Sequence, residues 1–452
     1  MMTAIKLSDY IHKPIYIAPL AFFRIAFGAV LFISSIRFIA HGWIKDFYIT
    51  PRFHFPFYGF EWVPVLPPAG MYALYGAMAL SALMICAGLY YRMATILFLC
   101  CFVYAELIDK TYYLNHYYLV TVMVLLMSLV PANRYFSADV LRKPSLKRTH
   151  VPAWTINIFK WQLAIIYIYA AISKMNTDWL INAMPLKIWL PANQFIPVIG
   201  KWLALPATAV VFCWCGMLFD LSIVFLLLNR VTRPVGYFFA MVFHLLTAVL
   251  FQIGMFPYIM LAATSIFFSD RVHLRILHVI SSIIPSWRKI DIQQNYVAPV
   301  MCKKAGLIFL LVYFVFQLFI PIRFLLYPGK LLWTEEGYRF SWRVMLMEKG
   351  GTTFFHVIEP ATGRRIEVNN RDFLTGYQER MMETQPDMML QYAKILKTEY
   401  EKMGIQHAAV QAESYVTLNG SGSRLFIDST VNLAAQKETL FGHKKWILPY
   451  QP

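Results

Sequence analysis

Long apolar runs separated by short polar segments make up most of the chain. Several runs approach or exceed the ~20 residues that a helix needs to cross a bilayer. Within a membrane such runs must be helical, because a helix satisfies its own backbone N–H and C=O groups. The pattern predicts about nine spans, over residues 16–41, 70–89, 93–109, 115–131, 153–174, 206–228, 234–252, 254–269 and 304–327. The last two runs before residue 270 flank Gly254, and they could form one span or two.

The pattern changes after residue 327. Short β-like stretches alternate with turn signals at 354–358, 415–418 and 424–428. A helix is expected from about Pro386 to Met403, because proline suits a first helical turn and the apolar residues that follow mark one face. We therefore predict a polytopic α-helical membrane protein, with a transmembrane domain over residues 1–327 and an α+β extramembrane module over residues 328–452.

Composition and charge agree with a membrane protein. The 452 residues are 59% hydrophobic and 14% charged, with a formal net charge of +17, whereas soluble domains average about 25% charged residues. The positive charges lie between apolar runs, which argues against a nucleic-acid partner. With a cytoplasmic N-terminus, Lys and Arg on the inner side outnumber those on the outer side about threefold. The odd number of spans then places the C-terminal module outside.

Cysteine usage predicts neither a structural disulfide nor a metal site. Five of the six cysteines lie in apolar runs, Cys302 lies in a basic segment, and the C-terminal module has none. Cys213 and Cys215 would point to two faces of one helix, which does not suit zinc. The lack of external cysteines favours a bacterial inner membrane over an oxidising compartment.

Two polar groups stand out at the ends of apolar runs. Lys174 ends the run over 153–174, and Asn115 and His116 begin the run over 115–131. The charge bias puts all three at the outer membrane boundary. Lys174 could be an interfacial lysine that reaches water, or a base, since burial disfavours the charged form of its amine. His116 could serve near a helix cap or, with Asn115, stabilise a developing oxyanion.

Other intramembrane polar residues have simpler interpretations. Asp220 is expected to pair with a buried cation or hydroxyl, and His244 to be a satisfied core histidine. Gly254 interrupts an apolar run, where it could permit a ligand to approach the backbone or simply mark a kink. In the C-terminal module an aromatic cluster between Trp333 and Trp342 suits either the membrane interface or a peptide-binding groove.

Four separated segments, in the same order, resemble one family. They are LIDKTYYLNHYYL, AAISKMNTDW, FQIGMFPYIMLA and WTEEGYRFSW. Together they resemble the vitamin K-dependent γ-glutamyl carboxylase and its bacterial relatives, which share an HTTM domain, over roughly residues 15–430. The resemblance implies an integral membrane enzyme. It would oxidise a reduced naphthoquinone, vitamin K or menaquinone, to its epoxide with dioxygen, and add carbon dioxide to the γ-carbon of a peptide glutamate.

The resemblance also implies roles for individual residues. Lys174 would deprotonate the hydroquinone, and Asn115 and His116 would stabilise an oxygenated intermediate. The quinone-side positions are Ile253, Gly254, Met255 and Phe256. The substrate-side positions are Trp333, Tyr338, Ser341 and Trp342, with Arg380 matching, loosely, an arginine that holds the glutamate.

Some positions depart from the family. Met347 and Lys349 stand where the animal enzyme has histidine and arginine; Lys349 could still bind a carboxylate, but with less defined geometry. The family's inter-region disulfide and its long C-terminal propeptide-binding part have no counterpart here. Two alternatives therefore stay open. One is a quinol epoxidase or oxygenase that does not carboxylate glutamate, and the other is a non-enzymatic quinone- or lipid-binding protein.

Overall fold

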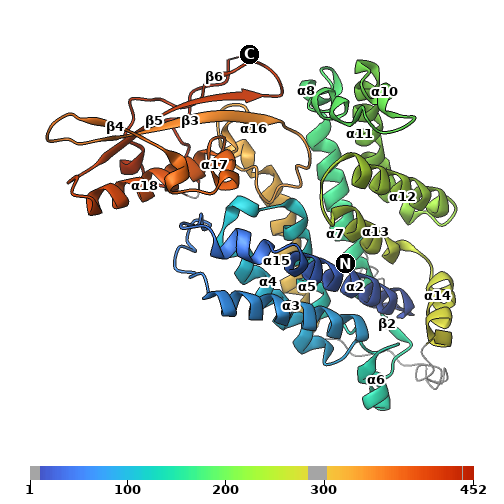
Figure 1. Cartoon of the computed structure of the whole chain (residues 1–452). Coiled ribbons are helices and arrows are strands. Elements are labelled where there is room, and N and C mark those ends of the chain that lie inside the picture. The colour runs from blue at the N-terminus through green and yellow to red at the C-terminus, as the bar shows by residue number, and fades with distance from the viewer. Residues whose placement is uncertain (1–10, 284–302, 440, 452) are drawn as a thin grey trace.

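The computed structural model describes residues 11–283, 303–439 and 441–451 (Figure 1). Seven helical segments in these residues are long and apolar enough to cross a membrane. They are α2 (Ala18–Ala40), α3 (Pro68–Ala87), α4 (Tyr91–Ile108), α7 (Trp154–Lys174), α11 (Pro206–Leu228), α12 (Arg233–Leu250) and Gly306–Leu326, which joins α15 (Lys303–Phe319) to the 3-10 helix η7 (Ile320–Leu326). The apolar helices α5 (Asn115–Leu129) and α13 (Phe256–Thr264), the latter extended by η5 (Ser265–Phe267), are shorter. The predicted polytopic fold is confirmed.

The apolar run around Gly254 forms two helices. α12 ends at Leu250, and α13 begins at Phe256. Gly254 has φ +60°, a left-handed conformation that glycine adopts readily. Pro257 then occupies the first turn of α13, where its missing N–H costs nothing. The turn over 251–255 is therefore built by the glycine and proline that the sequence places there.

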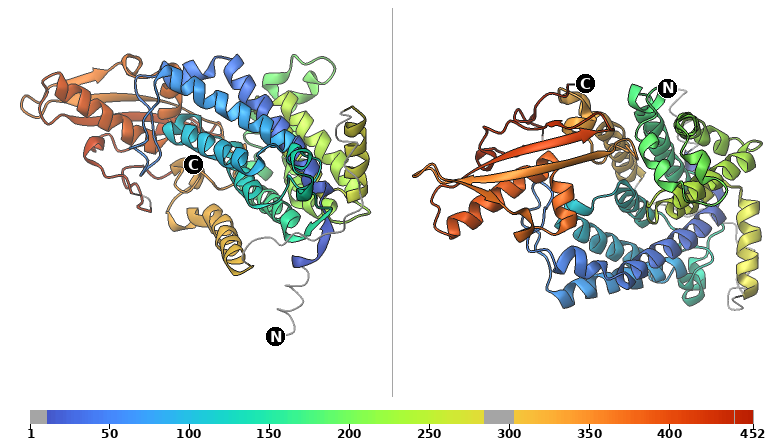
Figure 2. Two further views of the ribbon diagram at one scale, coloured as in Figure 1. Left: turned by 90° about the horizontal axis from the view of Figure 1, so that it is seen from below. Right: turned by 45° about the horizontal axis from the view of Figure 1, so that its top comes forward.

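The first transmembrane helices pack against one another in sequence order, and the later ones pack around α7. α2 packs against α3, α3 against α4, and α4 against α5, while α7 contacts α11 and α13 (Figure 2). A two-stranded pair, β1 (Pro14–Tyr16) with β2 (His150–Pro152), links the start of α2 to the start of α7. The remaining helices are α6 (Ala138–Arg142), α8 (Thr177–Leu180), α9 (Leu186–Trp189), α10 (Gly200–Leu203), α14 (Asp270–Ile283) and α16 (Leu331–Thr334).

Arg24 connects α2 to two other parts of the membrane domain. Its side chain is fully buried, and its guanidinium donates hydrogen bonds to four backbone carbonyls. Two of these belong to Ile85 and Cys86 at the end of α3, at 3.0 and 2.6 Å, and the others to Ala132 and Phe136. These carbonyls lie at or beyond helix ends, where backbone groups lack intrahelical partners. Ile85 O also accepts from Gly88 N at 3.0 Å, so Arg24 adds a second donor there and supplies the donor for Cys86 O and Ala132 O.

The C-terminal module is an antiparallel sheet covered by two helices. The strand order is β4 (Arg365–Val368), β3 (Lys349–Ile358), β5 (Ala409–Leu418) and β6 (Arg424–Leu425). α17 (Gly376–Met382) and α18 (Pro386–Lys402) lie along one face (Figure 1). The buried side chains of β5 alternate with less buried ones, as expected for a sheet with one covered face. The predicted α+β character is confirmed, while the domain boundary after residue 327 stays a prediction.

Hydrogen bonds fix the module against the ends of the membrane helices that face it. Nε2 of Gln378 on α17 donates to Phe53 O at 2.8 Å and to Asp109 Oδ2 at 3.2 Å. Nδ2 of Asn115 donates to Arg343 O at 2.9 Å. Burial raises the pKa of Asp109 to about 6, although hydrogen bonds from Thr111 and Gln378 oppose the shift. The module is therefore seated on the α4–α5 connection.

Asp387 is the centre of an ion-pair group at the same junction. Its carboxylate contacts Lys110 Nζ at 2.9 Å and Arg339 Nη1 at 2.5 Å, and the side chain of Lys110 is almost fully buried. Burial alone would raise the pKa of Asp387. The charges and hydrogen bonds of Arg339 and Lys110 outweigh that effect and lower the pKa below its usual 3.8. A carboxyl group shifted this way stabilises the fold above pH ~4 and loses that contribution as the pH falls further.

We expect Asp387→Asn to lower the free energy of unfolding by about 3 kcal/mol at pH 7, because it leaves two buried cations without a counterion. The deficit relative to wild type should narrow as the pH falls below ~4, because the Asp387 carboxyl takes up a proton in the unfolded state while the folded state keeps it ionised. Thermal unfolding of both proteins in one detergent from pH 7 to pH 3 measures this. Glu401→Gln, which removes an exposed partner of Lys397, is the control. A deficit that does not change with pH would contradict the assignment.

Candidate active site

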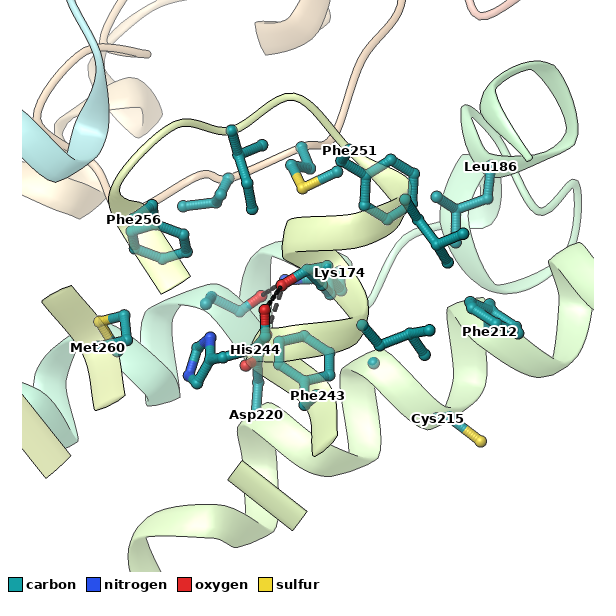
Figure 3. Close-up of a pocket in the computed structure, with 18 of the residues that line it drawn as sticks. Lys174, Leu186, Phe212, Cys215, Asp220, Phe243, His244, Phe251, Phe256 and Met260 are labelled. Atoms are coloured by element: carbon teal, nitrogen blue, oxygen red, sulfur yellow. Dashed lines mark hydrogen bonds and ion pairs between the residues drawn. The ribbon is translucent and has the colours of Figure 1, made fainter. Parts of the chain in front are cut away.

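Lys174 lines an apolar cavity between α7, α11 and α12. This Lys174 cavity has a volume of about 290 Å³, and its walls include Phe243, Phe251 and Phe256 (Figure 3). Val211 and Cys215 also line it and are exposed on the outer surface of α11. Since α11 is a membrane helix, the cavity reaches a surface that faces lipid. An apolar pocket of this kind suits a flat, hydrophobic ligand that enters from the bilayer.

The polar group in this cavity is an ion pair. Lys174 Nζ lies 2.7 Å from Asp220 Oδ2, and both side chains are about nine-tenths or more buried. Figure 3 shows the two side chains pointing toward each other among the aromatic rings. The ammonium also lies 5.4 Å from the ring of Trp179. The expectation that Asp220 pairs with a buried cation is met by Lys174 itself, which the sequence had treated as an isolated amine.

His244 faces the same cavity. Its Nε2 lies 3.0 Å from the Tyr167 hydroxyl, and its ring lies edge-on to Phe256 with centroids 6.1 Å apart. Its Nδ1 is buried without a hydrogen-bond partner in the described residues. His244 is therefore a core histidine held on one side, with its second nitrogen unsatisfied.

A second, larger cavity contains His116. This His116 cavity has a volume of about 730 Å³ and lies between the C-terminal end of α2, the N-terminal end of α5 and the C-terminal module. The imidazole is largely buried and packs against Phe256, with ring centroids 5.9 Å apart. One N–H of Asn115 is used to hold Arg343 O, and its Oδ1 accepts from the Tyr113 hydroxyl. Ile253, Gly254, Met255 and Phe256 all line this cavity.

The two cavities share a wall. Phe251, Ile253 and Phe256 from the α12–α13 turn, with Val344 and Met345 from the module, line both. Lys174 and His116 thus lie in neighbouring cavities and not in one pocket. The turn that the sequence predicted beside a quinone stands between them.

Two family models match the chain. The one described as HTTM domain matches residues 12–271, and the one described as vitamin K-dependent gamma-carboxylase, lumenal domain, matches residues 302–452. The chain belongs to the vitamin K-dependent gamma-carboxylase family. No solved structure matches it.

Membership in the carboxylase family gives the site a chemical context. The family implies an enzyme of the vitamin K-dependent carboxylase type, with reduced vitamin K hydroquinone, dioxygen and carbon dioxide as reactants and a glutamate-containing substrate. The apolar helices of the chain agree with a multi-pass membrane protein.

The predicted substrate-side residues of this carboxylase occupy different places. Tyr338 lines the His116 cavity. Ser341 and Trp342 are buried beside it, with Trp342 stacked on Tyr118 at 4.8 Å. Trp333 lies in the core of the module, between Phe426 and Tyr450, and its Nε1 donates to Leu448 O. Trp333 does not line either cavity.

The two cations predicted on the substrate side, Lys349 and Arg380, lie in different surroundings. Lys349 is buried at the start of β3, where its Nζ lies 2.8 Å from Glu335 Oε1 and 2.8 Å from Trp333 O. Burial lowers the pKa of Lys349, and the charge of Glu335 acts against that change. Arg380 is exposed on α17, with its guanidinium 5.8 Å from the ring of Tyr377. Tyr377 lines the His116 cavity, but Lys349 and Arg380 do not.

The sequence did not single out four polar or flexible residues of this carboxylase site. Arg37, Gln252, Arg343 and Met345 all line the His116 cavity. Arg37 lies within the first apolar run, and Arg343 directly follows the SW pair of the aromatic segment. A signal was available for Arg343, since a cation next to a substrate-side motif is a candidate ligand for an acidic group.

Proposed function

We propose that the chain is an integral membrane carboxylase that couples oxidation of a reduced naphthoquinone to γ-carboxylation of a peptide glutamate. The observation that supports this most directly is the Lys174–Asp220 pair, held in an apolar cavity that reaches the lipid-facing surface. A quinol would bind there, and the module above the His116 cavity would present the peptide. We further propose a bacterial inner membrane, with a cytoplasmic N-terminus and the module outside.

The residues of the Lys174 cavity fit a naphthoquinol. Phe243, Phe251 and Phe256 offer flat apolar surface, and the Lys174–Asp220 pair is the polar group that a ring hydroxyl could contact. When bound with dioxygen, the quinol, whether vitamin K or menaquinone, supplies the oxidation that drives the reaction. The chain itself would exclude water, orient the ring and hold the proton.

The Lys174–Asp220 pair can accept one proton. Lys174 and Asp220 together are neutral, whether as ammonium and carboxylate or as amine and carboxylic acid. When the O–H bond of the quinol breaks, the pair takes the proton and becomes an ammonium beside a carboxylic acid, with a charge of +1 next to the −1 of the quinolate. Charge is thus conserved in the cavity, and the attraction is strong where water is excluded. Lys174 acts as the base once its own proton has passed to Asp220, whose Oδ2 lies 2.7 Å from Nζ.

Asn115 and His116 would act on the other side of the shared wall. The imidazole of His116 faces its cavity, where it could donate to a developing oxyanion. Asn115 keeps one N–H free of Arg343 and could assist. Ile253 and Phe256 would border the reacting ring, because they line both cavities, and Gly254 and Met255 would border it from the His116 cavity.

One assay tests the proposal. Purified protein is incubated with reduced vitamin K, a short peptide that contains glutamate, and labelled bicarbonate, and epoxide and fixed label are followed together. We expect both products to form in comparable amounts. Epoxide without fixed label would show a quinol epoxidase that does not carboxylate glutamate, the alternative that the departures at Met347 and Lys349 favour. Formation of neither product would favour a non-enzymatic quinone- or lipid-binding protein.

A further inference from the structure

The His116 cavity contains two guanidinium groups and no acidic side chain. Arg37 enters it from the outer end of α2, and Arg343 enters it from the module segment that follows Trp342. Among the described residues that line this cavity, none is Asp or Glu. The walls therefore carry an excess of positive charge, which favours an anionic ligand.

Neither guanidinium has a carboxylate partner within the described residues. Arg37 lies 4.7 Å from the ring of Trp43, and Arg343 lies 4.3 Å from the ring of Phe324. Nε of Arg343 is buried and has no hydrogen-bond partner. Both arginines are partly buried, and a partly buried cation without a counterion favours a ligand that brings a negative charge.

Three cations at the junction with the module are already neutralised. Lys110 and Arg339 share Asp387, and Lys349 contacts Glu335. Arg323 has no carboxylate in the described residues but donates to Ile320 O and Arg339 O. Arg37 and Arg343 differ from these cations, because they have neither a carboxylate nor a carbonyl partner among the described residues. A pair of guanidiniums is also suited to a carboxylate, because each presents a planar fork of N–H donors.

The shape around Arg37 leaves room for such a ligand. Gly254 has φ +60°, and a Cβ placed on it would lie 3.8 Å from Nη1 of Arg37. Glycine here keeps the space in front of the guanidinium free of a side chain. Gln252 adds an amide group to the same cavity, and Tyr338 and Tyr377 add aromatic surface from the module.

We propose that Arg37 and Arg343 bind the γ-carboxylate of the peptide glutamate that is to be modified. This inference rests on the function proposed above and assigns the substrate's charged group to two residues. The carboxylate would lie on the module side of the shared wall, with its γ-carbon toward Ile253 and Phe256. Lys349, which is paired with Glu335, and Arg380, which is exposed on α17, would not hold this group.

Binding of two matched peptides tests this assignment without relying on turnover. The peptides are identical except that one carries glutamate and the other carries glutamine at the same position. Their affinities are measured by fluorescence anisotropy with protein in nanodiscs of neutral lipid. We expect wild type to bind the glutamate peptide at least about tenfold more tightly, the effect of one charge-assisted hydrogen bond. Arg37→Gln and Arg343→Gln should each reduce this preference, and the double variant should abolish it.

The controls separate charge, geometry and folding. Arg37→Lys keeps the charge but loses the planar fork of N–H donors, and it should retain part of the preference for the glutamate peptide. Arg364→Gln alters an exposed arginine in the β3–β4 turn and should keep the full wild-type preference. If Arg343→Gln does not fold, judged by its thermal unfolding, Arg37→Gln alone decides the test.

Two results would overturn the inference. One is an unchanged preference for glutamate in Arg37→Gln. The other is loss of bound anionic lipid from the variants, measured by native mass spectrometry, with no change in peptide preference, which would make the site a headgroup site. Because the readout is binding, a wild type that makes no epoxide would disprove the proposed function and still leave this assignment testable.

Discussion

Lys174→Met is expected to lower the rate of epoxide formation by about 10³-fold, the range of a lost general base. Methionine is similar in length and remains apolar, so the cavity keeps its shape while the amine is removed. Epoxide is measured by chromatography at saturating reduced vitamin K, with and without peptide. Lys201→Met, which changes an exposed lysine, should retain the wild-type rate. Retention of more than about a tenth of the activity in Lys174→Met would exclude Lys174 as the base.

Asp220→Asn distinguishes a shared proton site from an isolated lysine. In this variant the amine has no carboxylate to take its proton, so it must lose that proton to solvent before it can act. We expect a slower formation of epoxide at saturating reduced vitamin K, because the pair has lost the carboxylate that accepts the lysine proton. Asp220→Glu should recover part of the loss. A wild-type rate of epoxide formation in Asp220→Asn would show that the carboxylate only fills space.

The largest effect on stability is expected from Arg24→Met. The substitution removes a donor from four backbone carbonyls, and those of Cys86 and Ala132 have no other donor among the described residues. Each unsatisfied buried group costs about 1–3 kcal/mol, so the total loss should be about 4 kcal/mol or more. Thermal unfolding in detergent measures the change, and it should appear as a clear fall in Tm or as failure to accumulate folded protein.

Arg92→Met is the matched control, because Arg92 is exposed at the start of α4. It should unfold within a few tenths of a kcal/mol of wild type. Arg24→Lys should fall between the two, since lysine keeps the charge and offers fewer donors. If Arg24→Met were as stable as the control, the four hydrogen bonds would have no net worth in the folded protein.

The membrane fold could be predicted from run length and charge alone. α2, α7 and α11 lie within a few residues of the expected spans because a bilayer demands a minimum apolar length. The turn at Gly254 could not be decided, since its direction depends on how α13 packs against α2 and α7. In the module, the helix expected from Pro386 is present as α18, while β4 and α17 were missed because their short segments carry weak patterns.

The site was less predictable because its contacts join distant segments. Lys174 and Asp220 were both noted, but nothing in the chain shows that residues 46 apart meet at 2.7 Å. From the sequence, the aromatic segment could belong to the membrane interface or to a peptide-binding groove. In the structure its residues have different places, since Tyr338 lines a cavity and Trp333 lies in the core of the module. Arg343 stands next to recognised motif residues, yet its lack of a counterion appears only in three dimensions.

Val344 and Met345 give the module a part in closing the Lys174 cavity. If the module were cut away, water would reach the ion pair and compete with any bound quinol for its proton. The membrane domain and the module should therefore be inactive when they are expressed as separate proteins. A module taken from a relative should support oxidation only if it brings residues that close the cavity as Val344 and Met345 do. New peptide specificity would then evolve at the rim of the module, away from Val344 and Met345, which keep water out of the Lys174 cavity.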